Sequence, residues 1–186
     1  TEIFRTALPD VIRILPSRFG DHRGFFSETY SQLAYANLGI EAVFVQDNHS
    51  LSAAVGTVRG LHFQVPPHAQ AKLVRCGRGA IFDVAVDIRR GSPTYGRWAG
   101  FTLSAENGAQ LYIPVGFAHG FATLEPDSEI IYKCSDYYAP ETEGALRWDD
   151  SDIGIAWPLT AAPVLSEKDA SAPLLADFNS PCTFEG

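Results

Sequence analysis

Two histidines and a lysine that could transfer protons or bind a metal lie within one short stretch, RGLHFQVPPHAQAKLVRC, at residues 59–76. His62 and His68 are six residues apart, and Lys72 follows four residues later. A neutral imidazole can accept a proton or bind a metal, whereas an ammonium offers no lone pair to a metal. A third histidine, His119, ends a later Pro-x-Gly-x-x-His run. Whether these side chains serve in catalysis, in metal binding or only in packing depends on the strands and turns that position them.

The remaining pattern predicts mostly β-structure, because short runs rich in Val, Ile, Phe and Tyr are separated by Gly, Pro and Asn. In the strand expected at 80–88, apolar residues alternate with Asp83 and Asp87, which share the opposite face. Further strands are expected within residues 41–50, 57–65, 71–76, 96–104, 109–115, 120–124 and 129–138.

One amphipathic helix is expected over 27–39, where Ser27 can cap its start and Gly39 can end it. The segment 141–155 and the C-terminal tail are expected to be loops with short helical turns. Many short antiparallel strands and one early helix predict a mainly β sandwich or small barrel. Because no repeat, low-complexity tract or linker interrupts the pattern, we expect one domain over 1–186.

Charge and composition narrow the class of protein. A net charge of −8 argues against a nucleic-acid polymer as partner, although a local cluster of Arg and Lys could still bind a small phosphorylated ligand. No apolar run approaches the roughly 18 residues of a membrane span, and the N-terminus has no signal-peptide pattern. Cys76, Cys134 and Cys182 are widely spaced, which predicts buried thiols in a reducing compartment. We therefore expect a cytoplasmic protein without a membrane partner.

The run that ends at His119 resembles the second motif of the cupin superfamily, a double-stranded β-helix that often binds a metal. The spacing of the first cupin motif can be fitted with its glutamate at Lys72 and its glycine at Gly79. The His-x-His of that motif then falls on Pro66 and His68. Because neither a proline nor an ammonium can ligate a metal, we expect no metal site. A cupin-like barrel without a metal needs another use for its polar residues.

Seven sequence blocks carry a more specific resemblance, to the dTDP-4-dehydrorhamnose 3,5-epimerases. These enzymes invert two carbons of a 4-keto-6-deoxy sugar nucleotide. The resemblance implies a mainly β, cupin-like double-stranded β-helix or jelly-roll barrel with a few short helices. The blocks, in order, are FGDHRGFFSETY (19–30), FVQDNHS (44–50), VRGLHFQ (58–64), AKLVRCGRGAIFDVAVDIRRGSPTYG (71–96), YIPVGFAHGF (112–121), YKCSDYYAPETEGALRWDD (132–150) and LSEKD (165–169).

The resemblance also implies a role for each matching residue. His62 would be the general base, oriented by Asp169, and Tyr132 would be the acid on the other side of the sugar. Lys72 would face the carbonyl oxygen of the substrate, and Tyr138 would stack on the thymine. Family members are homodimers in which the N-terminal segment of one chain helps complete the site of its partner. The remaining substrate contacts would be Arg23, Glu28, Gln46, Asn48, Arg59, His119, Glu143 and Lys168.

The chemistry of inversion next to a ketone fits these residue types. Such a reaction needs a base, a stabilised enolate oxygen and a proton donor on the opposite face. His62 suits the base because an imidazole titrates near neutrality, and Lys72 can place a positive charge beside the developing oxyanion. Tyr132 can return a proton to carbon. No net redox change occurs and no G-x-G-x-x-G or P-loop motif is present, so we expect no metal, nicotinamide or flavin cofactor.

The diphosphate of the substrate needs cationic groups, and Arg23, Arg59 and Lys168 are the candidates. One position conflicts with simple strand alternation, which puts Arg59 on the face opposite His62. Either a bulge at Gly60 redirects the arginine, or it reaches the substrate from a different direction.

Three other functions stay open from the sequence. A single-carbon epimerase or a ketoisomerase serving natural-product deoxysugars could keep His62, Tyr132 and Asp169 and differ only in pocket shape. A non-catalytic cupin could bind a sugar nucleotide without reaction, and a metal-dependent cupin would require a divalent ion. The principal expectation is epimerisation at C3 and C5 of dTDP-4-dehydro-6-deoxy-D-glucose to dTDP-4-dehydro-L-rhamnose.

Overall fold

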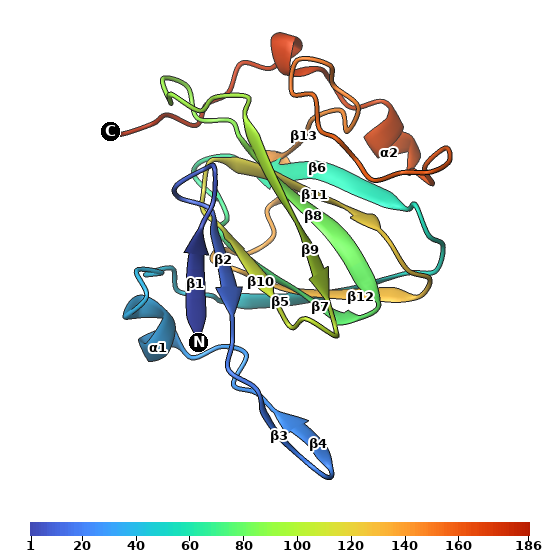
Figure 1. Ribbon diagram of the computed structural model, residues 1–186. Coiled ribbons are helices and arrows are strands. Elements are labelled where there is room, and N and C mark those ends of the chain that lie inside the picture. Colours follow the sequence, from blue (N-terminus) through green and yellow to red (C-terminus); the bar gives the residue numbers. More distant parts are fainter.

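Two antiparallel sheets pack face to face in the computed structural model, which describes all residues 1–186 (Figure 1). In order across the six-stranded sheet, the strands are β1 (Glu2–Arg5), β2 (Ile12–Leu15), β10 (Gln110–Ile113), β7 (Lys72–Arg78), β12 (Ser128–Cys134) and β5 (Gln46–Ser52). The five-stranded sheet has β13 (Glu143–Ala145), β6 (Val58–Gln64), β11 (Phe117–Thr123), β8 (Ala80–Asp87) and β9 (Trp98–Ser104). The predicted mainly β, cupin-like jelly-roll class is confirmed.

Apolar residues form three layers around these sheets. The largest cluster fills the space between the sheets. Strand β8 contributes to two of the layers: on its inner face, Ile81 and Ala85 belong to this largest cluster. On the other face of the same strand, Val84 and Val86 pack under the C-terminal segment. A third cluster on the outer face of the six-stranded sheet is covered by α1 (Gln32–Ala36). The predicted alternation of β8 is confirmed, with both of its faces buried.

The expected helix over 27–39 is wrong at its N-terminal end. The helix α1 begins after Ser31, whose side chain accepts from the Ala34 N–H, and the hydroxyl of Ser27 instead donates to the Ser17 carbonyl. The backbone before Ser31 is held in another way, because the Thr29 carbonyl accepts hydrogen bonds from the Tyr35 hydroxyl of α1 and from the Gln110 amide of β10. The C-terminal boundary also differs, because the helix ends at Ala36 with Asn37 as its C-cap, and Gly39, with φ of 86°, lies in the turn that follows.

Several short strands escape the sequence pattern. The edge strands β1 and β2, the hairpin of β3 (Phe19–Asp21) and β4 (Gly24–Phe26), and β13 were not expected. Each has three or four residues, which is too short for alternation to be recognised. The tail forms α2 (Glu167–Ala170) and a 3₁₀ turn (Leu175–Asp177), as expected for loops with short helical turns. No helix is long and apolar enough to cross a membrane.

The β3–β4 hairpin projects away from the two sheets (Figure 1). Phe19, Phe25 and Phe26 are 67%, 62% and 70% exposed, respectively. The guanidinium of Arg18 lies over the Phe25 ring, 4.4 Å from its centroid, and donates to the carbonyls of Ala105 and Glu106. The base of this aromatic arm is therefore fixed to the body, whereas the arm itself has no apolar cover within the chain.

Candidate active site

A cavity of about 460 Å³ opens between the two sheets beside α2. The six-stranded sheet contributes residues of β5, β7 and β12, and the five-stranded sheet contributes residues of β6, β11 and β13. Every predicted site residue except two lines this cavity. The residues brought together are His62, Tyr132, Asp169, Lys72, Gln46, Asn48, Arg59, His119, Tyr138, Glu143 and Lys168.

His62 and Asp169 form a close pair, with 2.5 Å between Nε2 and Oδ1. Asp169 is buried in the first turn of α2, where the Ser166 hydroxyl accepts from its N–H, and its Oδ2 accepts from the Gly60 N–H. Burial by itself raises the pKa of Asp169, but the hydrogen bond and charge of His62, with the Gly60 and Ser166 contacts, lower the pKa overall. The ionised carboxylate fixes Nε2 as the protonated ring nitrogen and leaves Nδ1 free to accept a proton.

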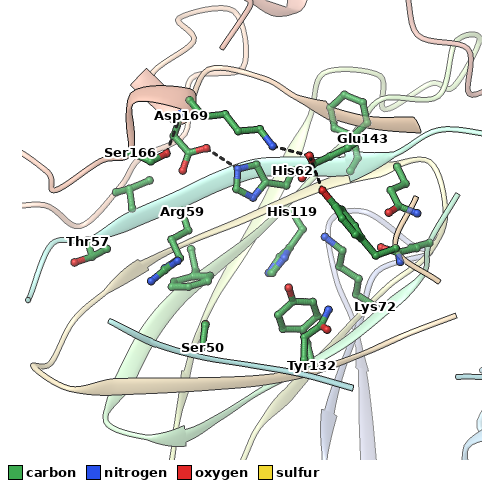
Figure 2. Close-up of a pocket in the computed structure, with 18 of the residues that line it drawn as sticks. Ser50, Thr57, Arg59, His62, Lys72, His119, Tyr132, Glu143, Ser166 and Asp169 are labelled. Atoms are coloured by element: carbon green, nitrogen blue, oxygen red, sulfur yellow. Dashed lines mark hydrogen bonds and ion pairs between the residues drawn. The ribbon is translucent and has the colours of Figure 1, made fainter. Parts of the chain in front are cut away.

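A bulge at Gly60 resolves the orientation of Arg59. On β11, His119 pairs with His62 and Phe121 pairs with Arg59, so three steps on β6 match two steps on β11. Gly60 has φ of 124°, and a Cβ there would lie 2.6 Å from the Gly120 Cα. Only glycine fits this conformation and this close approach. The bulge turns Arg59 toward the same cavity as His62 (Figure 2). Of the two alternatives predicted for Arg59, the bulge at Gly60 is therefore the correct one.

Lys72 lies on the inner face of β7 and is only 9% exposed. The other two lysines of the chain, Lys133 and Lys168, pair with Asp47 and Glu143, but the Lys72 ammonium forms no salt bridge. Burial lowers the pKa of Lys72, and the nearby charges, Asp83 among them, counteract this. An ammonium without a carboxylate partner in a small cavity is available to an oxyanion of a bound ligand.

Tyr132 on β12 lies across the cavity from His62, on the opposite wall (Figure 2). The Lys72 ammonium lies 5.8 Å from the centre of the Tyr132 ring. Asn48 on β5 is the cross-strand neighbour of Tyr132. Burial is the main cause that raises the pKa of Tyr132. The phenol therefore stays protonated near neutral pH, as a proton donor requires.

His119 forms a second histidine–aspartate pair, deeper in the cavity. Its Nε2 lies 2.7 Å from Oδ1 of Asp83 on β8, and both side chains are buried. Burial lowers the pKa of His119, and the charges of Lys72 and His62 lower it further, against the opposing effect of Asp83. Sequence alternation identifies Asp83 only as a charged residue on an apolar strand and gives no sign of this pairing.

The rim of the cavity is closed by a chain of polar contacts. Glu143 Oε2 lies 2.7 Å from Lys168 Nζ and accepts from the Tyr138 hydroxyl at 3.4 Å. The Tyr138 N–H donates to Gln46 Oε1, which ties this exposed aromatic ring to β5. Gln64 on β6 holds the loop that carries Tyr138, because its amide donates to the Tyr137 carbonyl and accepts from the Ala139 N–H.

Arg23 and Glu28 are the two predicted site residues that the chain does not bring to the cavity. Both are exposed, and Arg23 pairs with Asp21 within the β3–β4 hairpin. Other lining residues were missed by sequence reasoning, because single serines, threonines and glutamines carry no spacing signal. They include Ser50, Thr57, Gln64, Gln70 and Ser166.

The residues aligned with cupin metal ligands do not gather around a common point in the cavity. His68 pairs with Asp136 outside the cavity lining. No group of three or more His, Cys, Asp or Glu side chains is arranged to hold a metal ion. The three cysteines are free and buried, as predicted.

A jelly-roll cavity with an Asp-oriented histidine on one wall, a tyrosine on the other and a buried ammonium beside it defines a class: an acid–base enzyme for carbon acids. Residues 5–177 match the family model described as dTDP-4-dehydrorhamnose 3,5-epimerase. An enzyme of that name from Salmonella typhimurium is 55% identical over 174 residues, which is 93% of this chain and 94% of the relative. The chain belongs to the dTDP-4-dehydrorhamnose 3,5-epimerase family.

Solved structures agree with this membership. A Legionella pneumophila dTDP-6-deoxy-D-glucose-3,5-epimerase in complex with dTDP-4-keto-L-rhamnose superposes with a TM-score of 0.92 at 47% identity, covering 96% of this chain and 94% of that one. A 3'-monoepimerase from Streptomyces bikiniensis in complex with dTDP-quinovose has a TM-score of 0.86 at 37% identity, with 92% and 87% covered. The fold is therefore shared by epimerases that act on two carbons and by one that acts on a single carbon.

Proposed function

We propose that this chain epimerises C3 and C5 of dTDP-4-dehydro-6-deoxy-D-glucose to give dTDP-4-dehydro-L-rhamnose. The observation that supports the proposal is the geometry of His62 and Tyr132, which face each other across one cavity. Inversion of a carbon needs a proton removed from one face and a proton delivered to the other. Two groups on opposite walls meet this requirement without any movement of the sheets.

In the proposed mechanism, Nδ1 of His62 takes the proton from the carbon next to the 4-keto group, and Asp169 stabilises the imidazolium. The electron pair of the broken C–H bond moves into the ketone and forms an enolate, whose oxygen is stabilised by the Lys72 ammonium. Tyr132 then donates its hydroxyl proton to the carbon from the opposite face. Exchange with water returns the proton to Tyr132 and removes the one on His62, and the second carbon follows the same steps.

The rim supports binding of a nucleotide. The exposed ring of Tyr138 can stack on the thymine, and Arg59 and Lys168 can bind the diphosphate. Gln46, Asn48, His119 and Glu143 are then left to contact the sugar and the nucleoside. The relative from Legionella pneumophila, with a dTDP-sugar in its structure, supports this assignment for a cavity of the same fold.

We further propose a homodimer in which the β3–β4 hairpin of one chain completes the cavity of its partner. The hairpin carries exposed aromatic rings and Arg23, and it lies outside the cavity of its own chain. A second copy of the chain would cover the rings and receive Arg23 and Glu28 at its site. We also infer that residues 1–186 form a single cupin-like epimerase domain. We infer further that the protein works in the cytoplasm, where its three free thiols stay reduced.

Mixing two inactive variants tests the exchange of hairpins. Arg23→Ala damages the hairpin and His62→Ala damages the base, so each protein alone should be nearly inactive. A hybrid dimer contains one cavity with an intact base and an intact hairpin, so refolding an equal mixture should recover about a quarter of wild-type activity. No recovery above the sum of the two variants, together with a monomer in sedimentation analysis, would contradict the dimer proposal.

Solvent exchange tests the reaction itself. The 4-keto sugar nucleotide is incubated with the protein in heavy water, and proton NMR follows each carbon. We expect deuterium at both C3 and C5 together with formation of the L-sugar. No deuterium at either carbon would refute the enzymatic proposal and leave a binding protein. Deuterium at C3 alone would favour the second candidate, a single-carbon epimerase, which the structural likeness to a 3'-monoepimerase keeps in view.

A further inference from the structure

Asp83 is a buried carboxylate that the proposed mechanism does not use. It lies on the inner face of β8 with 0% exposure, and only its Oδ1 has a partner, the Nε2 of His119. Its Oδ2 has no hydrogen-bond partner in the chain. An ionised carboxylate in an apolar interior is costly unless its charge is compensated. Because burying the Asp83 carboxylate in this way lowers the stability of the fold, we infer that its negative charge has a function.

The other buried aspartates show what full compensation looks like. Asp87, on the same strand, accepts from Arg89, Ser92 and Thr94. Asp150 accepts only backbone N–H groups, on both of its oxygens. Asp169 uses one oxygen for His62 and the other for Gly60. Asp83 alone combines complete burial with a free oxygen and no cationic hydrogen-bond partner other than a histidine.

Asp83 bonds His119, which lines the same cavity as Lys72, and both Asp83 and Lys72 are buried there or directly behind its wall. The charge of Asp83 therefore acts on Lys72, the buried cation without a carboxylate partner. Two other groups could compensate this ammonium. Glu143 is already paired with Lys168, and burial raises the pKa of the Cys134 thiol, so this thiol stays neutral. Asp83 is therefore the unshared negative charge at this position. The titratable groups around Lys72 are Asp83 on β8, His119 on β11, Tyr132 and Cys134 on β12, His62 on β6 and Glu143 on β13.

The same carboxylate restricts the proton on His119. A carboxylate accepts only, so the Nε2 of His119 must carry the hydrogen of their contact. In a neutral imidazole the other nitrogen, Nδ1, is then an acceptor. Burial and the charge of the Lys72 ammonium favour the neutral ring. His119 would thus accept a hydrogen bond from a hydroxyl of the sugar and would not compete with His62 as a proton carrier.

We propose that Asp83 is a positioning residue of this active site: it holds His119 as the neutral Nε2–H tautomer and supplies the buried negative charge that keeps Lys72 protonated for the enolate. The inference rests on the proposed function, because both effects serve the same carbonyl chemistry. Asp83 itself does not line the cavity, so it acts through His119 and Lys72.

The variant Asp83→Asn tests the charge, because the amide keeps the shape of the side chain and can still accept from His119. Loss of the negative charge lowers the pKa of Lys72, so the basic limb of the kcat–pH profile should move to lower pH by roughly one unit. At the alkaline end, kcat should fall roughly tenfold, while KM for the sugar nucleotide stays within about a factor of two. A basic limb at the wild-type position would overturn the inference.

Asp87→Asn is the matched control, since it makes the same change on the same strand at equal burial. Asp87 is bound to Arg89 and does not line the cavity. We expect it to lower the melting temperature but to leave the kcat–pH profile in place. An equal shift of the profile in both variants would show a general effect of core charge and would overturn the assignment to Asp83.

The tautomer can be read on the wild-type protein, which keeps the inference testable if Asp83→Asn does not fold. Nitrogen-15 NMR of labelled histidine, with the His119 signals identified from His119→Asn, should show a neutral ring protonated at Nε2 between pH 6 and pH 8. A protonated imidazolium or an Nδ1–H ring at pH 7 would overturn the inference. This measurement needs no turnover, so it stands or fails separately from the heavy-water experiment.

Discussion

The two histidine–aspartate pairs in the cavity have the same chemistry but different depth. The side chain of His62 is 33% exposed and its aspartate comes from a helical turn near the C-terminus, 107 residues away. The side chain of His119 is 7% exposed and its aspartate comes from the adjacent strand. A base must release its proton to water after each cycle, so the pair at the mouth suits catalysis. A buried imidazole keeps one proton state and suits a fixed hydrogen bond.

The difference between the pairs is tested most strongly at the outer histidine. His62→Ala removes the group that takes the proton, so kcat should fall by roughly 10⁴-fold and deuterium incorporation should fall with it. Proton NMR in heavy water measures both.

His68→Ala is the matched control, because His68 also pairs with an aspartate but lies outside the cavity lining. It should keep activity within about a factor of two, as is usual for exposed substitutions. Heavy-water exchange that survives His62→Ala would show that the base lies elsewhere.

The aspartate of the outer pair should have the next largest effect. Asp169→Asn can present its amide nitrogen to His62, which would place the ring proton on Nδ1 and block the base. We expect kcat to fall by roughly 10³-fold with little change in KM, as for other orienting aspartates. Steady-state kinetics measures this, with Asp136→Asn as the control at the partner of His68. Equal kcat values for Asp169→Asn and the control would mean that orientation of His62 does not depend on the carboxylate.

The opposite wall can be separated from both pairs by Tyr132→Phe. The base remains, so His62 can still remove a proton and return deuterium to the same face. Inversion should fall by roughly 10²-fold, while exchange at the carbon falls less. NMR gives the ratio of exchange to inversion, and Tyr137→Phe, an exposed ring outside the cavity lining, should leave it unchanged. A parallel loss of exchange and inversion in Tyr132→Phe would remove the phenol from the role of acid.

The sequence predicts the inner wall of the cavity better than its surroundings. Alternation alone puts Lys72 on the same face as Val74, and both are buried between the sheets. It fails at Arg59, because a bulge changes the parity of a strand and depends on the close approach of Gly120, a long-range contact. Asp169 could be found only through the family resemblance, since its partner is far away in the chain.

The loop that carries Tyr138 shows why the rim is hardest to predict. The side chains of Gln46, Gln64 and Gln70 hold its backbone, and none of them belongs to a spacing pattern. Gln64 donates to the carbonyls of His68 and Tyr137 and accepts from the Ala139 N–H. Gln70 donates to the Asp136 carbonyl. A buried glutamine that forms hydrogen bonds with three backbone groups connects separate loops. The sequence alone does not distinguish it from a surface glutamine.

Gln64→Leu should give the smallest effect and sharpen the boundary between rim and wall. Without the amide, the loop loses its hydrogen bonds at the Tyr137 carbonyl and the Ala139 N–H, and Tyr138 is less firmly fixed over the cavity. We expect KM for the sugar nucleotide to rise by roughly five- to tenfold, equal to about 1 kcal/mol, with kcat within about a factor of two. If Gln64 acts through Tyr138, the KM increases of Gln64→Leu and Tyr138→Ala should not add in the double variant. Additive increases, or a fall in kcat as large as that of Tyr132→Phe, would place Gln64 with the catalytic wall instead of the nucleotide rim.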